Sequence, residues 1–103
     1  MKVLLLTLLM FCSFTLQAST EADSEPGQAI YEQFCIICHQ DGVASAPKFH
    51  NTDDWKPRLA GRTLEDLLKS ANKGLNLMPE KGTCSDCSDD DLKAAIQYML
   101  PKP

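Results

Sequence analysis

Apolar residues recur every three to four positions in three stretches of this chain, a spacing typical of helices with one buried face. The stretches are residues 27–38, 63–73 and 89–100. Thr63 can cap the start of the second stretch and Gly74 can end it. Ser88 and Pro101 bound the third stretch in the same way. The pattern therefore predicts three amphipathic helices.

The first and last of these helices are expected to pack on each other. Ile30, Tyr31 and Phe34 lie on one side of the first helix. Gly27 lies four residues before Tyr31, and its lack of a side chain would let another helix approach closely. The last helix carries an apolar stripe with Tyr98 beside it. This stripe is the expected partner surface for the first helix.

Residues 40–61 lack such periodicity and contain several residues that favour turns. They include Gly42, Pro47, Asn51 and Pro57. The absence of a repeated apolar face, together with this punctuation, predicts one long loop.

The first 18 residues have the pattern of a secretory signal. Lys2 supplies a positive start, residues 3–16 are almost uninterruptedly apolar, and Ala18 is a small residue suited to cleavage. A retained membrane anchor is the alternative, although the apolar run is shorter than a bilayer span usually needs. Residues 19–26 are short, polar and acidic, and are expected to form a flexible tether. One domain, residues 27–103, then remains.

Size and charge restrict what this domain can do. Removal of residues 1–18 from the 103-residue chain leaves 85 residues, enough for one small domain with a marginal hydrophobic core. The formal net charge of −4 becomes −5 when Lys2 is removed, so nucleic acid is not expected as a partner. Export would place the domain in an oxidising compartment, where cysteines are expected to be covalently bonded.

The segment Cys35-Ile36-Ile37-Cys38-His39 has the C-x-x-C-H pattern of c-type haem attachment. Two thiols at this spacing lie on one face of a helical turn, where each can add to one vinyl group of a porphyrin. The imidazole of His39 can then occupy one axial position of the iron. A bare C-x-x-C could instead be half of a zinc site or a thiol-exchange pair. The adjacent histidine and the predicted export favour haem.

Met78 is the candidate for the second axial ligand. It lies in a loop after the second predicted helix, whereas Met1 and Met10 belong to the signal and Met99 to a predicted helix. A thioether is a soft ligand that raises the reduction potential of haem iron relative to a second histidine. Packing of Met78 in the core is the alternative reading, and His50 is an alternative ligand.

Two residues of the predicted loop are candidates for the haem pocket. Trp55 could close one edge and donate its indole N–H to a propionate, and Arg58 could offer a charge-assisted partner. The alternative is an ordinary core tryptophan and a surface arginine.

Cys84 and Cys87 form a second C-x-x-C pair, but the next residue is Ser88, so a second haem site is not indicated. In an exported protein a short disulfide is the expected state of this pair. A redox-active dithiol is the alternative. The three aspartates at 89–91 are explained by the positive end of the helix dipole and lack the loop pattern of a calcium site.

Taken together, these residues resemble the class I c-type cytochromes, and in particular the bacterial cytochrome c5 group. The haem motif, the Met-Pro loop and the C-terminal helix carry the resemblance to class I. Two longer segments carry the likeness to cytochrome c5: Gly74-Leu75-Asn76-Leu77-Met78-Pro79 and Cys84-Ser85-Asp86-Cys87-Ser88-Asp89. The likeness extends over residues 27–99. Ser45 and Ala46 depart from it, because the family loop is often richer in glycine there.

The resemblance implies a mostly α, cytochrome c-like fold of three to four helices around one covalently bound haem c. It implies that Cys35 and Cys38 form the thioethers and that His39 and Met78 are the axial ligands. It further implies that the carbonyl of Pro47 accepts the other ring hydrogen of His39. A Cys84–Cys87 disulfide and a crossing of the first and last helices at Gly27, Tyr31 and Tyr98 are implied as well.

From these observations we expect a periplasmic electron carrier and not an enzyme. Redox proteins of a respiratory or other periplasmic electron-transfer chain are the expected partners, with no small-molecule substrate. Membrane contact is expected only through partners or a retained N-terminal segment. Lys69, Lys73 and Lys81 against Glu80 give residues 69–81 an excess of positive charge that could steer an acidic partner. The alternative is a peroxidase-like enzyme or a ligand sensor in which Met78 is labile.

Overall fold

The computed structural model describes residues 25–103. The predicted signal, residues 1–18, and the predicted tether up to residue 24 lie outside the described residues. Glu25, which was expected in the tether, pairs with Lys102 at 2.7 Å. None of the helices in residues 25–103 has the length and apolar character needed to cross a bilayer.

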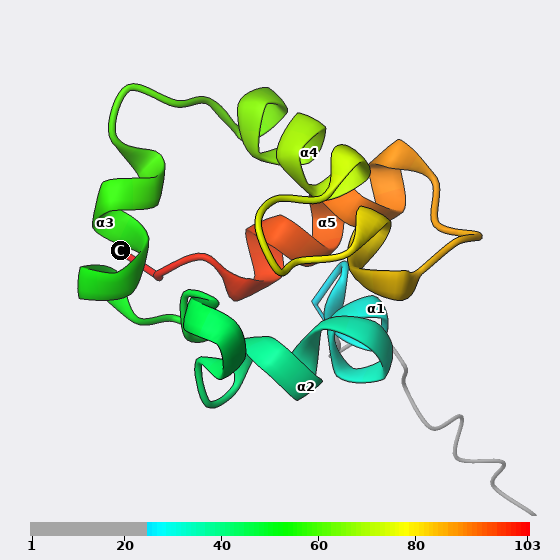
Figure 1. Ribbon diagram of the computed structural model, residues 1–103, viewed down its shortest axis with the longest axis horizontal. Coiled ribbons are helices and arrows are strands. Elements are labelled where there is room, and N and C mark those ends of the chain that lie inside the picture. Colours follow the sequence, from blue (N-terminus) through cyan, green and yellow to red (C-terminus); the bar gives the residue numbers. More distant parts are fainter. Residues whose placement is uncertain (1–24) are drawn as a thin grey trace, which may run out of the picture.

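The described residues form helices and turns and contain no β-strand. In chain order the elements are α1 (Gln28–Ile30), the π-helical turn η2 (Tyr31–Cys35), α2 (Ile36–His39), the turn η3 (Val43–Ser45), α3 (Thr52–Leu59), α4 (Leu64–Lys73), the turn η4 (Glu80–Thr83) and α5 (Asp89–Met99). Figure 1 shows α3 at one side of the molecule and α5 between α4 and the α1–α2 segment. The mostly helical fold predicted from the sequence is confirmed.

The first predicted helix is present and runs from Gln28 to His39 through α1, η2 and α2. It is not a uniform α-helix, because the backbone N–H of Ile36 donates to the carbonyl of Tyr31, five residues earlier. This π-helical turn ends at Cys35, the first residue of the haem motif. Such turns occur often at functional sites, and the apolar pattern gives no signal for this one.

The prediction of one long loop over residues 40–61 is wrong in its second half, which forms α3. The Asn51 side chain caps this helix by accepting a hydrogen bond from the N–H of Asp54 at 2.9 Å. Pro57 lies inside the helix, where it removes one backbone hydrogen bond without ending the helix. Only Trp55 of α3 is buried, so the repeated apolar face by which helices are recognised is missing.

The second and third predicted helices are confirmed as α4 and α5. Both begin with a capping box, formed by Thr63 with Asp66 in α4 and by Ser88 with Asp91 in α5. Gly74, with a φ of 82°, follows the last residue of α4. The capping residues at the ends of these two helices therefore predict their bounds correctly.

α1 approaches α5 at Gly27, as predicted. A Cβ atom at Gly27 would lie 2.2 Å from the carbonyl carbon and oxygen of Ala94 and 2.4 Å from the backbone nitrogen of Ala95. No side chain fits this space. Next to it the rings of Tyr31 and Tyr98 meet edge to face, with centroids 5.4 Å apart. The expected crossing of the first and last helices is confirmed.

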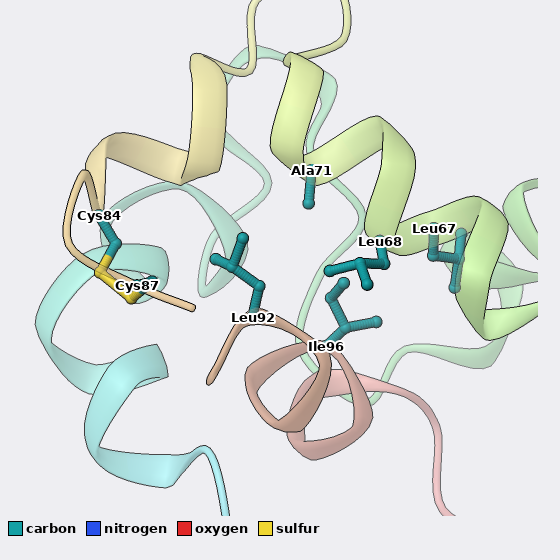
Figure 2. Close-up of a cluster of buried hydrophobic side chains, with 7 residues drawn as sticks. All are labelled: Leu67, Leu68, Ala71, Cys84, Cys87, Leu92 and Ile96. Atoms are coloured by element: carbon teal, nitrogen blue, oxygen red, sulfur yellow. A yellow bond between two sulfur atoms is a disulfide. The ribbon is translucent and has the colours of Figure 1, made fainter. Parts of the chain in front are cut away.

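α4 and α5 supply most of one buried cluster. Its members are Leu67, Leu68, Ala71, Cys84, Cys87, Leu92 and Ile96. Figure 2 shows Ile96 pointing toward Leu68 of α4 and Leu92 between Ala71 and the Cys84–Cys87 disulfide, which lies at the edge of the cluster. The two cysteines are only 3% and 4% exposed. The disulfide is thus part of the core, and its burial argues against the redox-active dithiol.

Candidate haem-binding site

A cavity of about 390 Å³ lies between α2, the η3 turn, α4 and the loop that carries Met78. Its volume falls within the range of roughly 300–1,000 Å³ that is common for ligand pockets. All seven residues that the sequence assigns to haem line it: Cys35, Cys38, His39, Pro47, Trp55, Arg58 and Met78. The fold therefore brings the haem motif and the Met78 loop to one cavity.

His39 is fixed in one tautomer by its surroundings. Its Nδ1 lies 2.8 Å from the carbonyl oxygen of Pro47, and because a carbonyl can only accept, Nδ1 carries the proton. Nε2 is then left with a free lone pair. Burial lowers the pKa of His39, the bond to Pro47 partly opposes this shift, and the nearby charge of Arg58 adds to it. The ring is thus held as the neutral imidazole that metal ligation requires.

The two cysteines of the motif carry free thiols. Cys35 ends η2 and Cys38 lies in α2. Burial raises the pKa of Cys35 to about 11. Thiol-exchange cysteines have lowered pKa values, so this shift speaks against that alternative. The zinc alternative fails as well, because the sulfurs of Cys84 and Cys87 are bonded to each other and cannot act as thiolate ligands.

Met78 ends a tight turn after α4. The N–H of Met78 donates to the carbonyl of Leu75 at 2.9 Å, and the N–H of Leu75 donates to the carbonyl of Met78 at 3.1 Å. Gly74 allows this turn, since a Cβ there would lie 2.9 Å from the Met78 carbonyl oxygen. The half-buried side chain of Met78 lines the cavity and also packs against the core cluster.

Trp55 and Arg58 line the cavity from α3, but one predicted contact is corrected. The indole N–H of Trp55 donates to the carbonyl of Lys48 at 2.9 Å, so it is not directed to a propionate. Arg58 donates through Nη2 to the carbonyl of Ser45 at 3.1 Å, which leaves further N–H groups for an anionic partner. The Trp55 ring lies nearly parallel to that of His39, with 12° between their planes.

His50, the alternative ligand, does not line this cavity. Its ring Nε2 lies 2.8 Å from the carbonyl of Tyr98, and its backbone N–H donates to the carbonyl of Met99 at 3.0 Å. His50 thus satisfies two carbonyls at the C-terminal end of α5. It is neither a solvated loop residue nor placed to replace Met78.

Comparison with known proteins also indicates a c-type cytochrome. Residues 22–99 match the family model described as cytochrome C oxidase, cbb3-type, subunit III. Cytochrome c5 of Azotobacter vinelandii is 46% identical over 74 residues, which cover 71% of this chain and 89% of that protein. The chain belongs to the cytochrome c5 family.

Solved structures agree with this assignment of the fold. A mono-heme ferrocytochrome c from Shewanella putrefaciens is 53% identical, with a TM-score of 0.64 over 75% of this chain and 94% of that one. A chain from an electron transfer complex of nitrite reductase with cytochrome c is 36% identical, with a TM-score of 0.67 over 74% of this chain and 91% of that one. This cytochrome c5 homologue therefore has the fold of a monohaem cytochrome c.

Members of this family carry one covalently bound haem c and act as electron carriers, not as enzymes. The cavity of this cytochrome suits that cofactor. It offers two free thiols, a neutral imidazole with an available nitrogen, a thioether and a guanidinium group within one largely apolar enclosure. The donor set is that of a haem c site.

Other residues of the site were not expected from the sequence. Ile37, Val43, Leu75 and Leu77 line the cavity and yet are exposed, Ile37 by 77% and Leu77 by 76%. They form an apolar rim around the cavity. Arg62 also lines it, held by Ser70 Oγ at 2.6 Å. The available signal for the rim was the presence of apolar residues within the haem motif and in the loops beside it, whereas nothing in the local sequence marks Arg62.

Proposed function

We propose that this cytochrome is a periplasmic carrier of single electrons whose haem iron is ligated by His39 and Met78. The observation that carries the proposal is the common cavity, which brings the imidazole of one segment and the thioether of another together with both free thiols. Haem supplies an iron that alternates between the ferrous and ferric states.

Different residues of the chain would attach the haem and bind its iron. The sulfurs of Cys35 and Cys38 would anchor it covalently. The Pro47 carbonyl fixes the Nδ1–H tautomer, which leaves Nε2 of His39 available to bind the metal. Met78 would supply the second axial ligand. If His39 and Met78 both bind the iron, no coordination position would be left for a substrate, which favours electron transfer over catalysis.

The apolar rim indicates where a redox partner would bind. Four exposed apolar side chains at the mouth of the cavity provide a surface that a partner can desolvate: Ile37, Val43, Leu75 and Leu77. A structural relative is part of an electron transfer complex with nitrite reductase, which supports a redox protein as partner. Electrons would pass through the cofactor edge within this rim.

The test is to express the chain from residue 1 in a host that matures c-type cytochromes, and to record the intact mass and the visible spectra. We expect the added mass of one haem, loss of the N-terminal segment, recovery from the periplasm, and the weak far-red band of a methionine bound to ferric iron. Retention of the protein in the cytoplasm would contradict export, and absence of the band would contradict Met78 ligation.

The rival function, a peroxidase-like enzyme or sensor with a labile Met78, predicts a different result. Rapid binding of carbon monoxide to the ferrous protein would support the rival, because the incoming ligand must displace the methionine. The carrier should bind carbon monoxide poorly, and a Met78→Ala variant, with that position open, provides the reference for fast binding.

A further inference from the structure

The backbone between Met78 and the disulfide is strained. Three consecutive residues have positive φ angles: Lys81 at 54°, Gly82 at 55° and Thr83 at 73°. Residues with a Cβ rarely adopt this region, because the Cβ lies too close to the following carbonyl. Lys81 and Thr83 therefore keep this conformation only if their surroundings hold them there.

On its C-terminal side the segment is held by the disulfide-bonded loop. The N–H of Cys84 donates to the carbonyl of Lys81 at 3.0 Å, and Lys81 Nζ donates to the carbonyl of Cys87 at 3.2 Å. The Cys84–Cys87 disulfide closes this loop inside the core. Lys81 is thus tied to the loop by its main chain and by its side chain.

On its N-terminal side the same segment adjoins the candidate ligand. The N–H of Gly82 donates to the carbonyl of Pro79 at 3.0 Å. A Cβ at Gly82 would lie 3.7 Å from Cε of Met78, so the Gly82 backbone lies next to the Met78 methyl group. A change in the conformation of Lys81–Thr83 would therefore move the immediate surroundings of the thioether.

We infer that the Cys84–Cys87 disulfide and Lys81 are positioning elements that keep Met78 in the haem cavity. The inference rests on the proposed ligation by Met78. Without the disulfide or the Lys81 bond, Lys81 and Thr83 can relax to backbone conformations that L-residues prefer, and the Met78 side chain loses its fixed place. The disulfide then determines ligand occupancy in addition to stability.

The experiment compares four haem-loaded proteins: the wild type, Cys84→Ala/Cys87→Ala, Lys81→Met, and the control Lys69→Met. Lys69 is exposed on α4, so its substitution removes one positive charge without touching the strained segment. For each protein we would record the far-red band of methionine-bound ferric iron, the rate of carbon monoxide binding to the ferrous form, and helical circular dichroism.

The double alanine variant should lose most of the far-red band and bind carbon monoxide at least about tenfold faster than the wild type. Lys81→Met should shift both readouts in the same direction by a smaller factor, and Lys69→Met should match the wild type. A disulfide that only stabilises the fold would lower thermal stability and leave both ligation readouts unchanged.

Unchanged spectra and binding rates in folded variants would overturn the inference while leaving the proposed function intact. If the double variant does not fold, Lys81→Met decides, because it keeps the disulfide. A wild-type protein that lacks the far-red band would overturn Met78 ligation, and this inference with it.

Discussion

Trp55 connects the haem cavity to the loop that positions His39. It is buried, lies parallel to His39, and donates its only hydrogen bond to the carbonyl of Lys48, in the loop that also supplies Pro47. The carbonyl of Pro47 in turn fixes His39. Trp55 thus stabilises the loop that sets the histidine, and it does so without a polar contact into the cavity.

A Trp55→Phe substitution should therefore lower stability and leave the electronic properties of the site nearly unchanged. Loss of the hydrogen bond and of part of the buried ring should cost about 2 kcal/mol of unfolding free energy, against about 4 kcal/mol for Trp55→Ala. Denaturant unfolding and a redox titration would measure the two effects. A shifted midpoint potential at unchanged stability would show instead that the indole acts on the haem.

At the level of elements, Gly27 makes the contact between α1 and α5 possible. Gly27→Ala should cost about 4 kcal/mol, because the new Cβ adds a clash with the Ala94–Ala95 backbone to the cost of a positive φ.

Gly61→Ala is the matched control for Gly27→Ala. Gly61 also has a positive φ, 65°, but nothing lies within 4 Å of a Cβ there, so the cost should be only about 1 kcal/mol. The difference, measured by thermal or denaturant unfolding, isolates the helix crossing. Equal losses in the two variants would mean that α1 can move away from α5.

The capping box of α4 should give stability a specific dependence on acid. The backbone N–H and hydroxyl of Thr63 donate to the Asp66 carboxylate and hold the pKa of Asp66 below its usual value. A lowered pKa means that the carboxylate stabilises the folded chain above the unfolded pKa, and that this contribution is lost as pH falls through the folded pKa.

We therefore expect the stability advantage of the wild type over Asp66→Asn to be full at neutral pH and to shrink progressively below about pH 5. Denaturant unfolding of both proteins over this range measures it. Thr63→Ala, which removes one of the two donors, should show a smaller dependence on acid. An advantage that stays constant with pH would exclude the carboxylate as its source.

Some helices could be predicted from the sequence alone and others could not. α4 and α5 were predictable because apolar spacing and capping residues agree at both ends. α3 was missed because it buries a single residue and contains Pro57, so its start was marked only by Asn51 and two acidic residues. The π-helical turn that ends at Cys35 has no signal in the apolar pattern. In the site, residues with distinctive chemistry were found from their types and spacing. The contact of His39 with the Pro47 carbonyl was expected only through the family resemblance, and that of Trp55 with the Lys48 carbonyl was not expected.

At the scale of the whole molecule, the haem cavity lies between two buried clusters. Leu67, Ala71 and Ile96 of one cluster line it, as do Trp55 and Met99 of the other. A domain of this size has a marginal core of its own. A covalently bound macrocycle between the clusters supplies apolar surface to both, so the cofactor completes the core as well as performing the chemistry.

The charge distribution of the molecule suggests how partners are chosen. The chain is acidic overall, with a formal net charge of −4, yet residues 69–81 contain three lysines, Lys69, Lys73 and Lys81, and one acidic residue, Glu80. Lys69 and Lys73 are exposed, and this segment includes Leu75 and Leu77 of the apolar rim. This basic border lies beside the apolar rim. The lysines should steer an acidic redox partner toward the molecule, and the apolar rim should then make the close contact.

Electron transfer to an acidic partner should therefore slow as ionic strength rises, because salt screens the attraction. Lys73→Glu should slow the second-order rate several-fold at low salt and flatten its salt dependence, since one attractive charge becomes repulsive. Lys56→Glu on α3 makes the same change in net charge outside the segment and should have a smaller effect. Stopped-flow kinetics over a range of salt concentrations would measure this, and equal effects of the two variants would show that net charge, not the basic border, governs association.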